Sequence, residues 1–138
     1  MINKKILVVD DDPDVRKGMH LRLAANHYDT FFAADAVTTL IEARKHKPDL
    51  IILDLGLPAG DGFVVMERLK TIPSLGVIPV IVVSARDARA NQPLALKAGA
   101  KAFLQKPVDN AELLAVIRQA LGEPAAPKKA VVYDMGTV

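Results

Sequence analysis

Five short apolar runs recur along the chain, and the stretches between them carry apolar residues at helical spacing. Most of the runs are continuous rather than alternating, which is typical of parallel strands buried on both faces. Because strand and helix alternate five times, the pattern predicts a parallel α/β sheet joined by right-handed crossovers. The predicted strands cover residues 6–9, 30–34, 50–53, 80–83 and 102–104.

Aspartates mark the predicted starts of most helices. Asp12 precedes Pro13, and an acidic N-cap followed by proline is a typical helix start. Asp109 and Glu112 form an Asp-x-x-Glu variant of the capping box ahead of the last helix. The candidate caps of the second and third helices are Asp35 and Asp61.

The fourth predicted helix is the least regular. Pro93 lies within "DARANQPLALKAGA", where it would remove a hydrogen bond from a helix that had begun near Ala88. We therefore expect this helix to begin late, near Asn91 or Gln92, and to end at Gly99.

The composition describes one ordinary domain. The 138 residues are 51% hydrophobic and 25% charged, and with 4% aromatic residues the core must be aliphatic. A net charge of +2 gives no case for contact with nucleic acid, and the absence of cysteine excludes disulfides and thiolate chemistry. No apolar run is long enough for a signal peptide or a membrane span, so we expect a cytoplasmic protein without membrane contact.

The composition changes after Leu121, which divides the chain into a domain at 1–121 and a tail at 122–138. The stretch "GEPAAPKK" is typical of a linker stiffened by proline, and "AVVYDMGTV" is too short to fold alone. This tail could be a docking strand, the beginning of another domain or a disordered end. A stand-alone adaptor and a regulatory part of a longer protein both stay open, and the linker favours the second.

Polar side chains follow the carboxyl ends of the predicted strands, where open parallel sheets bind ligands. Carboxylates this close cannot all stay ionised without a counterion, and Mg²⁺ takes oxygen ligands together with water and phosphate. A carboxylate is also a competent nucleophile toward phosphorus, and a nearby lysine and hydroxyl could bind phosphoryl oxygens. The sequence thus predicts a metal site with phosphoryl chemistry, built from Asp10, Asp11, Asp54, Ser84 and Lys106.

Four motifs, in matching order and separation, resemble the receiver domain of two-component response regulators over residues 3–121. These are the acidic pair Asp10-Asp11, "PDLIILDLGLPAGDG" around Asp54, "VIVVSARD" around Ser84 and "AGAKAFLQKPVD" around Lys106. The resemblance implies a flavodoxin-like, doubly wound five-stranded sheet of order 2-1-3-4-5 with five helices. It also implies a signalling switch rather than an enzyme, phosphorylated by a histidine kinase or a histidine phosphotransfer protein.

The resemblance also implies roles for the site residues. Asp54 would be the phosphoacceptor, and Lys106 would contact the phosphoryl group. Asp11 and Asp54 would bind Mg²⁺ directly, together with the backbone carbonyl of Gly56. Asp10 would act on the metal mostly through water.

A switch mechanism is implied as well. Ser84 and Phe103 match a pair in which a hydroxyl moves toward the phosphate and an aromatic ring turns inward. The fourth helix, fifth strand and fifth helix would form the output face, toward a downstream effector domain or protein, or toward a second copy of the chain. The peptide bond between Lys106 and Pro107 would be cis.

Some positions depart from the commonest receiver pattern. Gly56, two residues after Asp54, lacks the larger side chain of many relatives, and Arg86 follows Ser84 at the same spacing. Both flank the attacking or leaving oxygen, so we expect them to tune the rates of phosphorylation and hydrolysis. Phe103 replaces the common tyrosine and cannot form a hydroxyl hydrogen bond.

Three other functions fit parts of the pattern. A degenerate receiver would act only as a protein-interaction module. A Mg²⁺-dependent phosphatase of the haloacid dehalogenase type would carry a second aspartate where Gly56 stands, and a flavodoxin-like flavin protein would need a hydroxyl-rich loop in place of "DDDPD". Asp12 and Asp14 fit helix-start charges better than metal ligands, and the three histidines have no metal-like spacing.

Overall fold

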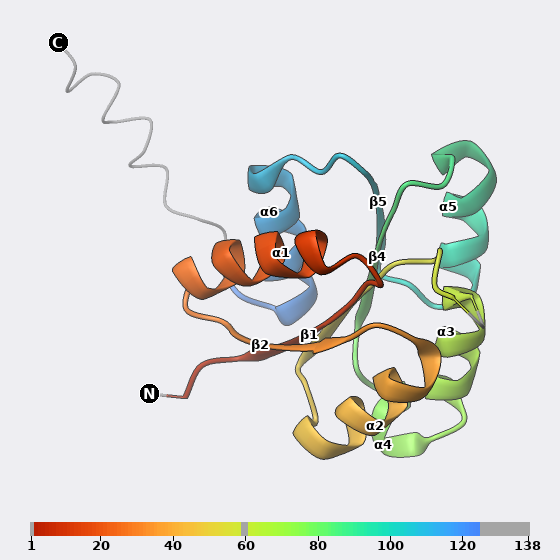
Figure 1. The fold of residues 1–138 in the computed structure, drawn as a ribbon, viewed down its shortest axis with the longest axis horizontal. Coiled ribbons are helices and arrows are strands. Elements are labelled where there is room, and N and C mark those ends of the chain that lie inside the picture. The colour runs from red at the N-terminus through yellow and green to blue at the C-terminus, as the bar shows by residue number, and fades with distance from the viewer. Residues whose placement is uncertain (1, 59–60, 125–138) are drawn as a thin grey trace, which may run out of the picture.

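A computed structural model describes residues 2–58 and 61–124 of the chain. Five parallel strands form one sheet in the order β2-β1-β3-β4-β5, which confirms the order that the receiver resemblance implied (Figure 1). The strands are β1 (Lys5–Val9), β2 (Asp29–Ala33), β3 (Leu50–Leu53), β4 (Val80–Ser84) and β5 (Ala102–Gln105).

Helices cover both faces of this sheet (Figure 1). One face carries α1 (Pro13–Ala25) and α6 (Asn110–Leu121). The other face carries α2 (Ala36–His46), α3 (Gly62–Lys70), α4 (Pro73–Gly76) and α5 (Ala88–Lys97). The sequence predicts five helices, and the structure adds the four-residue α4, which is too short to show helical periodicity.

The side chains of each strand alternate between two apolar cores, one under each layer of helices. In β1, Leu7 and Val9 belong to the core beneath α2 to α5, whereas Ile6 and Val8 belong to the core beneath α1 and α6. Burial on both faces explains why the strands appear in the sequence as continuous apolar runs. Such burial contributes about 2 kcal/mol for each aliphatic side chain.

Aspartate caps begin the helices where the sequence predicts them. The Asp12 side chain accepts a hydrogen bond from the backbone N–H of Asp14, and Asp109 accepts one from that of Glu112. These caps hold each helix start close to the carboxyl edge of the sheet, which positions the loops there. The corresponding pairs at α2 and α3 are Asp35 with Thr38 and Asp61 with Phe63.

The expected late start of the fourth helix is wrong. This helix, α5, begins at Ala88 and contains Pro93. Asp87 accepts a hydrogen bond from the Ala90 N–H (3.2 Å), and the side-chain amide of Asn91 donates to the Asp87 carbonyl (2.9 Å). A proline in the second turn removes one backbone hydrogen bond, and the capping contacts of the first turn offset that loss.

The described chain ends shortly after α6, at Pro124. Gly122 terminates the helix in the left-handed conformation (φ 70°), and Glu123 accepts a hydrogen bond from the Tyr28 hydroxyl (2.6 Å). The predictions for the tail from residue 125 onward lie outside the described residues. In the part of the chain that the structure describes, no helix is long and apolar enough to cross a membrane.

Candidate functional site

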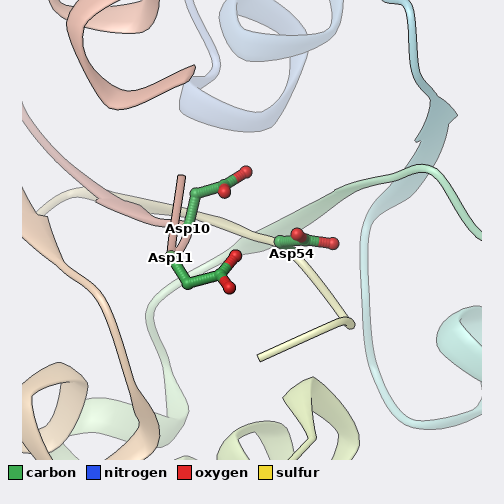
Figure 2. A group of neighbouring side chains, drawn as sticks. All are labelled: Asp10, Asp11 and Asp54. Carbon is green, nitrogen blue, oxygen red and sulfur yellow. The ribbon is translucent and has the colours of Figure 1, made fainter. Parts of the chain in front are cut away.

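The acidic residues that follow β1 and β3 lie side by side at the carboxyl edge of the sheet (Figure 2). Val9 is in register with Leu53, and the Asp54 N–H donates to the Val9 carbonyl (2.9 Å), so the two strands end together. Carboxylate oxygens of Asp10, Asp11 and Asp54 all lie within 4.8 Å of one another. The structure thus brings together the three acids that the sequence predicts to form the metal site.

The three carboxylates differ in burial. Asp10 and Asp54 are 4% and 8% exposed, whereas Asp11 is exposed. Buried like charges at this spacing repel, and they need a counterion or hydrogen bonds. An oxygen-only donor set with one exposed member fits a hard divalent cation such as Mg²⁺, which keeps several of its waters.

Lys106 brings a positive charge to the cluster from the end of β5. Its Nζ lies 2.7 Å from Asp10 Oδ2 and 3.4 Å from Asp54 Oδ2. Burial acts to lower the pKa of this ammonium, but the hydrogen bond to Asp10 and the charges of Asp10 and Asp54 outweigh burial and raise the pKa of Lys106. The lysine is therefore charged at neutral pH and neutralises part of the acidic cluster.

Backbone contacts fix the orientation of Asp10. Its Oδ1 accepts a hydrogen bond from the Asp12 N–H (2.9 Å), and Arg16 Nη1 donates to its carbonyl (2.7 Å). Neither the Arg16 contact nor the direct pairing of Asp10 with Lys106 was predicted from the sequence. Lys106 lies 96 residues away along the chain, so no local spacing could signal this pair.

Gly56 leaves open space beside Asp54. Its N–H donates to Asp54 Oδ1 (3.1 Å). Among the described atoms, a Cβ at this position would have only the two Asp54 carboxylate oxygens within 4 Å, at 3.8 and 3.9 Å. Gly56 therefore adds no side chain next to the carboxylate, and the role of the Gly56 carbonyl as a metal ligand stays a prediction.

Ser84 and Phe103 lie on the neighbouring strands β4 and β5. Ser84 is 1% exposed, and its Oγ accepts a hydrogen bond from the Arg86 N–H (3.2 Å). Phe103 is buried and packs in the core beneath α2 to α5. Their action as a coupled switch pair stays a prediction. The peptide bond between Lys106 and Pro107 is cis, as the resemblance implied.

Arg86 forms an ion pair with Asp61 that the sequence does not predict. Its Nη1 lies 3.2 Å from Asp61 Oδ2, and the two side chains are 36% and 41% exposed. The sequence predicts Asp61 only as a helix cap, because an aspartate before a helix looks the same in the sequence whether or not it also binds a distant arginine. The structure therefore adds Asp61 to the residues around the site.

Comparison of sequences connects the chain with response regulators. The sequence model of the family described as response regulator receiver domain matches residues 6–118. Response regulator PleD of Caulobacter vibrioides is 38% identical over 117 residues, which cover 85% of this chain and 26% of PleD. The KDP operon transcriptional regulatory protein KdpE of Escherichia coli is 40% identical over 121 residues, which cover 88% of this chain and 52% of KdpE. The chain therefore spans about a quarter to a half of these relatives.

A solved structure agrees with the sequence comparison. The crystal structure of a CheY-like response regulator receiver domain protein from Methanospirillum hungatei matches with a TM-score of 0.80 at 28% identity, and the match covers 88% of this chain and 95% of that chain. The sheet order and the strand-end acids described above agree with this assignment. The chain belongs to the response regulator receiver domain family of two-component signalling.

Proposed function

We propose that the chain is a phosphorylation switch in which Asp54 accepts a phosphoryl group from a phosphohistidine. The observation that carries this proposal is the place of the Asp54 carboxylate, beside both the Lys106 ammonium and the Asp10-Asp11 pair. At 8% exposure, Asp54 is a nucleophile held in a preorganised polar site, where opposite charges are already in position.

The residues of the chain would guide the transfer. An Asp54 oxygen attacks phosphorus, and the bond from phosphorus to the histidine nitrogen breaks. The phosphorylated ring takes up a proton from solvent, so it leaves as neutral imidazole. Lys106 would exchange part of its contact with Asp10 for a phosphoryl oxygen. Mg²⁺ held by Asp11, Asp54 and the Gly56 carbonyl, with Asp10 acting through water, would supply neutralisation of the phosphoryl charge.

The phosphorylated state would be transmitted through β4 and β5. Ser84 Oγ binds the Arg86 N–H in this structure and would turn toward the phosphoryl group. Phe103 lies on the adjacent strand, in register with Val82 of β4. The face formed by α5, β5 and α6 would then change toward an effector domain, an effector protein or a second copy of the chain. In this role the chain is a signalling switch rather than an enzyme.

A groove beside Lys106 suits the phosphodonor protein. It lies between α1 and the segment that follows β5, and it has a volume of about 500 Å³. A histidine kinase or a phosphotransfer protein that docks a helix here would bring its phosphohistidine to the edge of the site. Apolar side chains form much of the lining, among them Val15, Met19, Val83, Pro107 and Val108.

Intact mass after incubation with acetyl phosphate and Mg²⁺ tests the proposal. We expect one phosphoryl adduct on the native protein and none on Asp54→Asn or after chelation of the metal. Asp49→Asn is a matched control that should keep the adduct, because Asp49 is exposed and its side chain forms one described hydrogen bond, accepted from the Lys5 N–H. An adduct on Asp54→Asn would place the phosphoacceptor elsewhere. A native protein with neither adduct nor Mg²⁺ binding would instead be a receiver that acts by contact alone.

A further inference from the structure

The Arg86 side chain bridges the two loops that flank Asp54. Arg86 lies in the connection between β4 and α5, and its partner Asp61 lies in the connection between β3 and α3. Arg86 Nη1 and Asp61 Oδ2 are 3.2 Å apart, and neither side chain is fully buried. Exposed ion pairs of this kind contribute little net free energy, so the guanidinium can leave this partner at small cost.

Asp61 is held in a fixed position beside the backbone of Asp54. Its Oδ1 accepts a hydrogen bond from the Phe63 N–H (2.7 Å) and caps α3. The next residue, Gly62, is so close to β3 that a Cβ there would lie 2.7 Å from the Asp54 carbonyl oxygen and 2.8 Å from Leu55 Cα. The Asp61 carboxylate is therefore anchored near Asp54, and it would stay in place if the Arg86 guanidinium moved away.

The backbone of Arg86 is tied to the same site. Its N–H donates to Ser84 Oγ, which the proposed switch would turn toward the phosphoryl group. On the other side, Gly56 places no side chain beside the Asp54 carboxylate, where a Cβ would lie 3.8 Å from the nearer carboxylate oxygen. A long cationic side chain thus begins on the backbone segment that binds Ser84, and Gly56 adds no side chain between it and Asp54.

We propose that Arg86 is a reserve cation for the phosphoryl group: its guanidinium pairs with Asp61 before phosphorylation and moves to a phosphoryl oxygen on Asp54 afterwards. This inference rests on the proposed function. A guanidinium matches phosphoryl geometry, and its hydrogen bonds to an anion of higher charge are stronger than those to a single exposed carboxylate. Asp61 is then a positioning residue that competes with the phosphoryl group for Arg86.

Competition predicts effects of opposite sign for the two partners. Arg86→Gln removes the guanidinium and should weaken binding of a phosphoryl group, whereas Asp61→Asn releases Arg86 and should strengthen it. The asparagine keeps the cap of α3, because Asn is as good an N-cap as Asp. A simple structural ion pair between loops would instead make both variants change binding in the same direction.

Beryllofluoride, which mimics a phosphoryl group on a carboxylate, measures this difference at equilibrium. Calorimetric titration in saturating Mg²⁺ should show about tenfold weaker binding for Arg86→Gln and about threefold tighter binding for Asp61→Asn. The double variant should match Arg86→Gln alone, because Asp61 acts only through Arg86. Arg89→Gln removes the same charge from an exposed position nearby and should bind like the native protein.

The outcomes separate this inference from the proposed function. If Arg86→Gln binds beryllofluoride as tightly as the native protein does, the reserve-cation role is overturned and the proposed switch stays in place. Weaker binding in both single variants would also overturn it, in favour of a structural ion pair. The proposed function, and this inference with it, would be overturned by either of two results. One is a folded native protein that does not bind beryllofluoride in Mg²⁺, and the other is an Asp54→Asn protein that binds it as tightly as the native protein.

Discussion

Lys106 is closer to Asp10 than to Asp54: its Nζ lies 2.7 Å from Asp10 Oδ2 and 3.4 Å from Asp54 Oδ2. The ammonium therefore has its closer contact with Asp10, the more deeply buried of the two acids. Its contact with Asp54, the proposed phosphoacceptor, is the longer one. Under the proposed function, this arrangement stabilises the acidic cluster before phosphorylation and leaves Lys106 able to shift toward a phosphoryl oxygen. Lys106 would then serve both as the counterion before phosphorylation and as a contact of the phosphoryl group afterwards.

Replacing Lys106 should destabilise the protein in the absence of divalent cations. Lys106→Met leaves two buried carboxylates without their positive partner, and we expect the free energy of unfolding to fall by about 2 kcal/mol. Urea unfolding at neutral pH in a chelating buffer measures this loss. Lys101→Met, which changes an exposed lysine just before β5, is the control and should stay within about 0.5 kcal/mol of the native protein. A Lys106→Met protein as stable as the native one would show that the acids do not depend on this lysine.

Mg²⁺ should stabilise the native protein and have much less effect on Asp54→Asn. A ligand that binds only the folded state raises the free energy of unfolding, by about 2.7 kcal/mol at a hundred times its dissociation constant. Asp54→Asn removes one of the three clustered carboxylates, and so weakens the metal site. Thermal unfolding at increasing Mg²⁺ compares the two proteins, and NaCl at equal ionic strength separates site binding from general screening. Equal stabilisation of both proteins would argue that the metal does not bind at Asp54.

Tyr28 should make the protein less stable in alkaline solution. Burial, followed by the hydrogen bond to and the charge of Glu123, raises the pKa of Tyr28 to about 12 from 10.0. Between these values the unfolded chain has released the phenolic proton and the folded protein keeps it, so the free energy of unfolding falls as pH rises through this range. We expect a loss of about 1–2 kcal/mol, reduced by solvent around the partly exposed Glu123.

The comparison with Tyr28→Phe isolates this effect. The variant lacks the phenol, so its stability curve should fall less steeply than the native curve from about pH 10 to pH 12. Other groups that titrate in this range contribute to both curves and cancel in the difference. Parallel curves for the two proteins would mean that the Tyr28 pKa is the same in the folded and unfolded states.

Two glycines should respond in opposite ways to the same substitution. Gly62→Ala places a Cβ within 3 Å of the Asp54 carbonyl oxygen and of Leu55 Cα, so we expect a loss of about 2 kcal/mol or more and slower phosphorylation of Asp54. Gly18→Ala, inside α1, meets no described heavy atom within 4 Å beyond its own helix backbone and chain neighbours, and it should stabilise the protein by about 0.5–1 kcal/mol. Urea unfolding of both variants checks the signs. A tolerated alanine at position 62 would mean that the start of α3 can move away from β3.

Local rules account for much of what the sequence predicted correctly. Continuous apolar runs identified the five strands, since side chains such as Ile6 and Leu7 enter cores on opposite faces. Short-range hydrogen bonds at Asp12, Asp35, Asp61 and Asp109 began the helices where expected, because a cap needs only the next few backbone N–H groups. Local rules give the wrong start for α5, because the contacts of Asp87 offset the hydrogen bond that is lost at Pro93.

The strands, the capped helices and the polar residues that follow the strands were predictable from the sequence, because each depends on chemistry within a few residues. Which of those polar groups pair directly depends on the tertiary structure. Asp10 binds Lys106 across 96 residues, Arg86 reaches Asp61 across 25, and both pairings depend on the strand order and on loop directions that no local pattern contains. The acids were visible in the sequence, but their partners follow from how β3, β4 and β5 are placed beside β1.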